Sequence, residues 1–200
     1  MEYLGYLALG SVAGLVSGLF GLGGGTVIVP ILLLVFAAQG ISPEISTHMA
    51  IATSLACISI TSISSIYTHY QKGAVSWSLA QLFIPGMVFG TFIGTSFFVS
   101  LDGEALQILF GIFLLAIGLQ MVFYKAVESD AKLPSRTFLM SSGATIGGVS
   151  AVFGVGGGMF TTPLLMHFGV KIHQAIGVAA VGGFCVAFPA SIVYGITAVS

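Results

Sequence analysis

The sequence predicts an all-α integral membrane protein, a polytopic helix bundle made of two homologous repeats with glycine-broken helices. Of its 200 residues, 56% are hydrophobic and only 6% are charged, whereas a soluble domain carries about 25% charged residues. The charge-free runs are long, and one glycine-rich motif occurs twice. So few charges cannot cover a water-facing surface, and five Lys and Arg against six Asp and Glu give no basic footprint for nucleic acid.

The charged residues divide the chain into six long uncharged runs. A helix of about 20 apolar residues crosses the roughly 30 Å hydrocarbon layer, so each run can span the membrane at least once. Two runs are long enough to need a break or a second pass. We therefore expect a first repeat over 1–124, a cytoplasmic loop over 125–136 and a second repeat over 137–200. The first repeat would contain a broken segment at 3–38 and spans at 45–70, 77–100 and 104–124. The second repeat would contain a broken segment at 137–168 and a span at 173–198.

The first broken segment, 3–38, carries the motif GLVSGLFGLGGG at residues 14–25. Consecutive glycines favour non-helical backbone, and unpaired amides in hydrocarbon must be packed inside protein or line a wet cavity. A helix that begins after the break would direct its first N–H groups at an anion. Close helix packing is the alternative role for these glycines, but three adjacent ones point around all sides of a helix. The candidate binding residues here are Ser17, Gly23, Gly24, Gly25 and Pro30.

The span 45–70 is rich in hydroxyl side chains, which include Thr53 and Ser54. These two residues are candidates for the wall of a polar pathway that faces the glycine breaks. The alternative is that each hydroxyl bonds to a carbonyl of its own helix. His48 lies near the start of this span and His173 near the start of the last one, so both are candidates for proton coupling, with an interfacial position as the alternative.

The spans 77–100 and 104–124 separate Lys72 from the loop that carries Lys125, Lys132 and Arg136. Two crossings return the chain to the same side, which the positive-inside rule makes cytoplasmic. The spans contain no carboxylate, no nucleophile with an adjacent base and no metal-ligand spacing, and Cys57 and Cys185 lie in apolar runs as packing residues. We therefore expect no enzyme activity, no cofactor and no metal.

The second broken segment, 137–168, repeats the motif as GGVSAVFGVGGG at residues 147–158. A proline follows each motif five residues later, and HMAIA at 48–52 matches HQAIG at 173–177. The second repeat looks incomplete, because the two spans that follow the polar helix of the first half have no counterpart before Ser200. Its candidate binding residues are Ser150, Gly156, Gly157, Gly158 and Pro163.

The relative orientation of the repeats depends on how the broken segments cross. If each enters and leaves on one face, Lys171 joins the other basic residues inside and the repeats are inverted. If each crosses once, Lys171 falls outside and the repeats run parallel. The charge distribution favours inversion. Repeated halves are typical of secondary transporters, in which the substrate site lies between the repeats.

The paired Phe-Gly-x-Gly-Gly-Gly motifs, each followed by a proline, and Ala-Thr-Ser-Leu at 52–55 resemble the sulfite exporter TauE/SafE family of membrane permeases. The resemblance implies a multi-pass inner-membrane permease, surrounded by lipid, that exports sulfite or a small organosulfonate. The second half has Gly-Val-Ala-Ala at 177–180 in place of Ala-Thr-Ser-Leu, so the two hydroxyls are not repeated. The alternative is a transport-incompetent membrane subunit or fragment that needs a partner, missing C-terminal helices or homo-oligomerisation.

Overall fold

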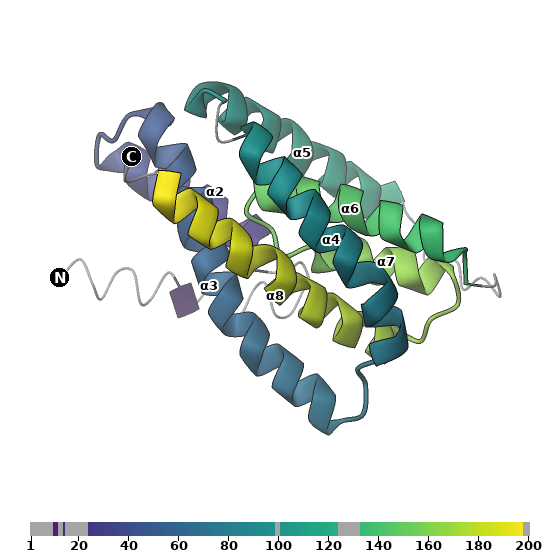
Figure 1. Cartoon of the computed structure of the whole chain (residues 1–200). Coiled ribbons are helices and arrows are strands. Elements are labelled where there is room, and N and C mark those ends of the chain that lie inside the picture. Colours follow the sequence, from purple (N-terminus) through teal and green to yellow (C-terminus); the bar gives the residue numbers. More distant parts are fainter. Residues whose placement is uncertain (1–9, 12–13, 15–23, 99–100, 124–132, 198–200) are drawn as a thin grey trace.

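The computed structural model describes residues 10–11, 14, 24–98, 101–123 and 133–197. Within these residues the chain forms seven helices and no strand, which confirms the all-α fold (Figure 1). In chain order they are α2 (Gly25–Ala38), α3 (Pro43–Gln71), α4 (Trp77–Phe98), α5 (Gly103–Phe123), α6 (Arg136–Val152), α7 (Gly158–His167) and α8 (Ile172–Thr197).

Four of these helices, α3, α4, α5 and α8, are long and apolar enough to cross a membrane. They fall on the ranges expected for spans. Large apolar side chains point outward from them; Ile60 on α3 is 73% exposed and Leu115 on α5 is 66% exposed. Side chains of this kind cost free energy in water and none in hydrocarbon. The outer surface therefore suits lipid, and the molecule is a polytopic helical membrane protein.

Helices α4 and α6 pack backbone to backbone through glycines. On α4, Gly86, Gly90 and Gly94 recur every fourth residue, and a β-carbon at any of them would overlap the α6 backbone. The partners advance in step along α6, from Met140 beside Gly86 to Gly148 beside Gly94. Small residues spaced by one turn permit this close approach. The two helices therefore run parallel.

The other contacts set the direction of the remaining long helices. Gly177 near the start of α8 lies against Ala74, just before α4, and Gly183 further along lies against Ser62 of α3. Helix α8 is thus parallel to α4 and antiparallel to α3. Gly103 at the start of α5 lies against Glu44 at the start of α3. Helices α4, α6 and α8 consequently begin at one end of the bundle, and α3 and α5 begin at the other.

This arrangement separates the charges of the described residues by sign. The basic residues Lys72, Arg136 and Lys171 stand at the end where α4, α6 and α8 begin, whereas the acidic residues Glu44, Asp102 and Glu104 stand at the opposite end. His69, in the last turn of α3, lies close to the charges of Lys72 and His173. The end of α3 and the start of α8 therefore lie at the same end of the bundle. Lys125 and Lys132 lie outside the described residues.

Helices α6 and α7 form a hairpin that starts and ends at the basic end of the bundle. The rings of Phe138, in the first turn of α6, and Phe168, just after α7, meet edge to face with centroids 5.7 Å apart. The segment predicted as broken at 137–168 thus enters and leaves at the same end. This path, with the antiparallel α3 and α8, is what inverted repeats require. Inversion itself stays a prediction, because half of the matching segment 3–38, including most of its glycine motif, lies outside the described residues.

Candidate functional site

The α6–α7 hairpin turns over inside the protein at residues 153–157. Gly154 and Gly157 have φ angles of 68° and 69°, a left-handed conformation that glycine adopts without steric cost. Gly154, Val155, Gly156 and Gly157 are all buried, and the Val155 amide donates to the Ser150 carbonyl at 2.9 Å. The second glycine motif therefore breaks its helix, and the irregular backbone is enclosed by protein, as hydrocarbon requires.

Residues of the first half reach this break in the second half. The Ser54 hydroxyl of α3, fully buried, donates to the Gly154 carbonyl at 2.8 Å. Gly25, the first residue of α2, lies so close to Gly154 that a β-carbon there would overlap the same carbonyl oxygen. Three predicted regions, the two glycine motifs and the polar helix α3, thus meet at one carbonyl group.

Helix α7 begins directly after the break, at Gly158. The Gly157 carbonyl accepts bonds from the Phe160 amide at 3.2 Å, the Thr161 amide at 3.0 Å and the Thr161 hydroxyl at 2.9 Å. By contrast, the amides of residues 156–159 donate to no carbonyl within the described part of the chain. Free amides at the positive end of a helix dipole are a ready site for an anion.

A buried hydroxyl stands beside these amides. Ser150 is fully buried, and its Oγ has no hydrogen-bond partner among the described residues. This oxygen lies 3.5 Å from the point that a β-carbon on Gly157 would occupy. The Met87 methyl group lies 2.8 Å from the same point, and the Met87 sulfur lies 2.7 Å from the equivalent point on Gly182. The methionine side chain therefore fills the space between the start of α7 and the middle of α8.

The other predicted binding residues differ in where the structure places them. Thr53 is exposed, on a different face of α3 from Ser54. Gly24 caps α2, Gly158 is the first residue of α7, and Pro30 and Pro163 lie half-buried inside those two helices. Gly23 and Ser17 lie outside the described residues. Their roles in binding stay predictions.

The two predicted proton-coupling histidines lie at opposite ends of the bundle, because α3 and α8 are antiparallel. The Nδ1 atom of His48 lies 2.9 Å from the Glu44 carbonyl oxygen, and its Nε2 is buried without a partner in the described structure. His173 is exposed in the first turn of α8. The pair therefore does not form one site, and any coupling role would belong to each histidine separately.

Sequence reasoning missed three residues that shape this region, Met87, Gly154 and Gly182. Gly154 belongs to the repeated motif, and its recurrence indicates the break but not the contact with α2 and α3. Nothing local in the sequence marks Met87, a methionine within an apolar span. Gly182 forms a pair with Gly183 in the middle of α8, and such pairs in a span are a signal for close contact.

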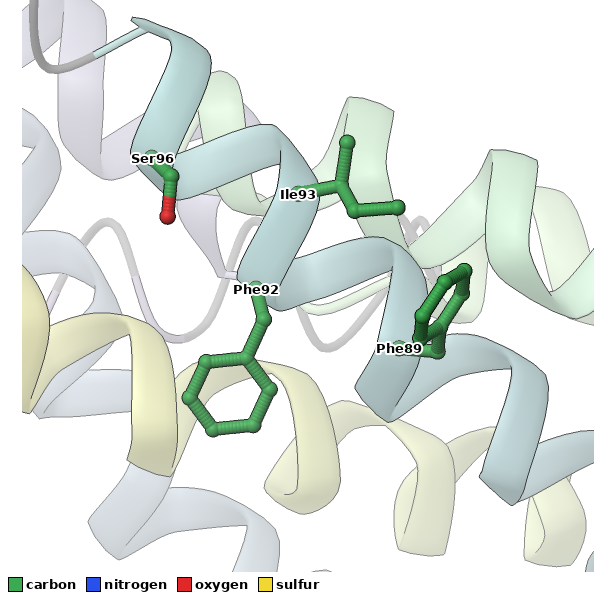
Figure 2. A pocket seen from close by; sticks show the side chains of 4 residues that line it. All are labelled: Phe89, Phe92, Ile93 and Ser96. Carbon is green, nitrogen blue, oxygen red and sulfur yellow. The ribbon is translucent and has the colours of Figure 1, made fainter.

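A separate hollow of about 490 Å³ lies on the outer side of α4, lined by Phe89, Phe92, Ile93 and Ser96 (Figure 2). Its four side chains come from one helix and are exposed. It has no contribution from the glycine motifs, so it is a feature of the lipid-facing surface. No cluster of His, Cys, Asp or Glu that could hold a metal occurs in the described part of the chain.

Three curated relatives resemble most of this chain, and each is named a probable membrane transporter protein. The relative from Haemophilus influenzae is 34% identical over 182 residues, which cover 90% of this chain and 67% of the relative. The relative from Methanocaldococcus jannaschii is 31% identical, and the match covers 86% of this chain and 65% of the relative. One from Xylella fastidiosa is 33% identical, and the match covers 88% of this chain and 68% of the relative. The chain thus spans about two thirds of the length of these relatives.

No solved structure matches the chain. The family model described as sulfite exporter TauE/SafE matches residues 6–200, which include both glycine motifs and every described helix. The match agrees with the apolar outer surface, with the candidate spans and with the names of the relatives, which call them probable membrane transporter proteins. On this evidence the chain belongs to the sulfite exporter TauE/SafE family of membrane transporters.

Proposed function

We propose that this chain is a secondary transporter that moves a small anion, sulfite or a related sulfur-containing anion or organosulfonate, across the cytoplasmic membrane. The buried turn of the α6–α7 hairpin is the observation that carries the proposal. There, Ser54 and Gly25 of the first half meet Gly154 of the second half, next to the α7 amides that donate to no carbonyl of the described residues. A site formed between repeats is where secondary transporters bind their substrates.

An anion fits this region better than a cation does. The N-terminus of α7 and the Ser150 hydroxyl offer donors, whereas the Gly154 carbonyl, an acceptor that would repel an anion, already receives a bond from Ser54. The described spans contain no Lys or Arg in their middle parts. Binding by dipoles and hydroxyl groups alone predicts modest affinity, which allows the anion to leave on the other side.

Transport by this arrangement would proceed by alternating access between two inverted repeats. The antiparallel α3 and α8 and the shared end of the α6–α7 hairpin support that orientation. The end with Lys72, Arg136 and Lys171 is proposed to face the cytoplasm, and there the positive charges would also attract the anion. His48 and His173, at opposite ends, are proposed to exchange protons with water on each side.

Efflux from liposomes tests the proposal. The purified chain is reconstituted with sulfite inside, and efflux is compared between the unmodified protein, Gly157→Ala and the matched control Gly118→Ala. A β-carbon at Gly157 meets Met87 and strains a left-handed backbone, whereas one at Gly118 meets nothing within 4 Å. We expect efflux to fall at least tenfold in Gly157→Ala only. Absence of efflux from the well-folded unmodified chain would contradict a self-sufficient sulfite carrier.

The second proposal is a membrane subunit that does not transport alone. The observation that favours it is that the chain covers about two thirds of the length of its relatives. In this case the well-folded chain would show no efflux of any sulfur-containing anion, and crosslinking in the membrane would capture a second copy or another helical partner.

A further inference from the structure

The Ser150 hydroxyl differs from other hydroxyl groups on α6 and on the helices α4 and α7. Thr91 on α4 donates to the Met87 carbonyl at 2.8 Å, Thr161 on α7 donates to the Gly157 carbonyl at 2.9 Å, and Ser142 on α6 itself donates to the Phe138 carbonyl at 2.7 Å. Buried hydroxyls in proteins almost always have such a partner. The Ser150 Oγ has none among the described residues, although the side chain is fully buried.

This hydroxyl lies next to Gly157, where α7 begins with amides that donate to no carbonyl of the described residues. The Oγ lies 3.5 Å from the position of a β-carbon on Gly157, the residue that caps α7. The described side chains nearest to Gly156 and Gly157 are those of Met87, Ser150, Ile146 and Ile58. Among these four side chains only that of Ser150 has a hydroxyl group, and none of them carries a charge.

We infer that the Ser150 hydroxyl and the first-turn amides of α7 bind the oxygens of a singly charged oxyanion of the sulfonate type, once the Met87 side chain turns aside. Methionine is flexible enough to do so, because its side chain has three rotatable bonds. The inference deepens the proposed transport function, on which its role in translocation rests, by naming the charge of the substrate and the groups that hold it.

The single charge follows from the donors available. The cost of removing an ion from water rises with the square of its charge, and a doubly charged anion in a buried site needs fixed positive charges to offset that cost. Amide dipoles and one hydroxyl are suited to one negative charge. Sulfite near neutral pH is a mixture of the doubly charged ion and singly charged hydrogensulfite, so this site would select hydrogensulfite and carry its proton with it.

Binding to the purified full chain in detergent tests the inference separately from transport. The shift in melting temperature is measured with methanesulfonate, which keeps a single charge at every pH used, with sulfate, which keeps two, and with sulfite over a range of pH. We expect stabilisation by methanesulfonate at every pH, none by sulfate, and a sulfite effect that declines as pH rises. Methanesulfonate also controls for titration of His48, His69 and His173, because any effect of these residues would change its binding too.

Two matched variants identify the donor. Ser150→Ala should weaken methanesulfonate binding on the order of tenfold, the usual effect of one hydrogen bond to a charged group, whereas Ser142→Ala on the same helix should leave it unchanged. Without ligand, Ser150→Ala should melt at or above the temperature of the unmodified protein, because it removes an unsatisfied buried group. A merely structural role for Ser150 would instead lower the melting temperature and leave the affinity unchanged.

The outcomes separate this inference from the proposed function. Unchanged methanesulfonate affinity in Ser150→Ala, or sulfite binding that strengthens as pH rises, would overturn the inference even if the liposomes show efflux. Methanesulfonate binding that depends on Ser150, in a chain that shows no efflux, would support the site and overturn self-sufficient transport.

Discussion

Two neighbouring hydroxyls, Thr53 and Ser54, differ completely in their surroundings. Ser54 is buried and bonded to the Gly154 carbonyl, whereas Thr53 is exposed on the side of α3 that faces outward. Adjacent residues on a helix point about 100° apart, so one step along the chain changes the partner from protein to lipid. The Ser54 hydroxyl therefore stabilises the turn between α6 and α7 from a helix of the other half.

Replacing Ser54 tests that role. Ser54→Ala leaves the buried Gly154 carbonyl without its donor, and we expect the free energy of unfolding to fall by about 1–3 kcal/mol. Thr53→Ala removes a hydroxyl from the outer face and should change it by less than about 0.5 kcal/mol. Melting of both variants in the same detergent measures the difference. Equal stabilities would contradict the assignment of the Ser54 bond.

The choice between these two hydroxyls also shows where sequence reasoning ends. Scarce charges and repeated glycines are local properties, and they predicted the helices and the break at 153–157. The sequence does not show which face of each helix packs inward, because in a membrane protein the lipid-facing side is as apolar as the packed side. The sequence of α3 therefore does not reveal that Ser54 faces inward, nor does a lone methionine reveal that Met87 covers Gly157. Those contacts arise only when α3, α4 and α8 pack together.

Among the helices, α4 and α6 form the closest pair, with the main chain of each against glycines of the other. In lipid no hydrophobic effect drives helices together, so their association depends on close contact and on van der Waals attraction. The stability of the bundle should therefore depend on small residues at this interface far more than on the large apolar side chains that face lipid.

Glycine-to-alanine changes measure this dependence. A β-carbon at Gly90 would overlap the Ala144 backbone, whereas one at Gly111 on α5 meets nothing within 4 Å. We expect Gly90→Ala to lower the free energy of unfolding by more than about 2 kcal/mol, in the range of overpacked sites, and Gly111→Ala to be neutral or to stabilise by up to about 1 kcal/mol through helix propensity. A stable Gly90→Ala protein, measured by the same melts, would mean that the two helices are not in close contact.

At the scale of the whole molecule, the distribution of the described charges between the two ends of the bundle follows the directions of the helices. The basic residues described at the ends of the helices share one end of the bundle and the acidic ones share the other, because α6 and α7 form a hairpin in place of a single crossing. An odd number of crossings there would have placed Lys171 at the acidic end. The segment 153–157 thus determines both the local site and the direction of α8.

Labelling from one side of the membrane tests this topology. Single cysteines are placed at Lys72, Lys171 and Asp102 in a chain with Cys57→Ala and Cys185→Ala, and intact cells or oriented vesicles are treated with a membrane-impermeant thiol reagent. We expect Lys72→Cys and Lys171→Cys to react from the same side and Asp102→Cys from the other. Reaction of Lys171→Cys together with Asp102→Cys would show that the second broken segment crosses the membrane.

The interlocked glycines of α4 and α6 also have a mechanical consequence. Neither helix can slide along the other, because a shift of one residue would drive side chains into positions that accept only hydrogen. Helices α4 and α6 should therefore move as one rigid unit. Movement that uncovers Gly157 has to occur at a joint between helices where the contact can deform. The contact between α4 and α8 at Gly182 is such a joint, since it is made by the thioether of Met87 and not by main chain. At Gly182 a flexible side chain, and not main chain, therefore lies between α8 and the α4–α6 pair.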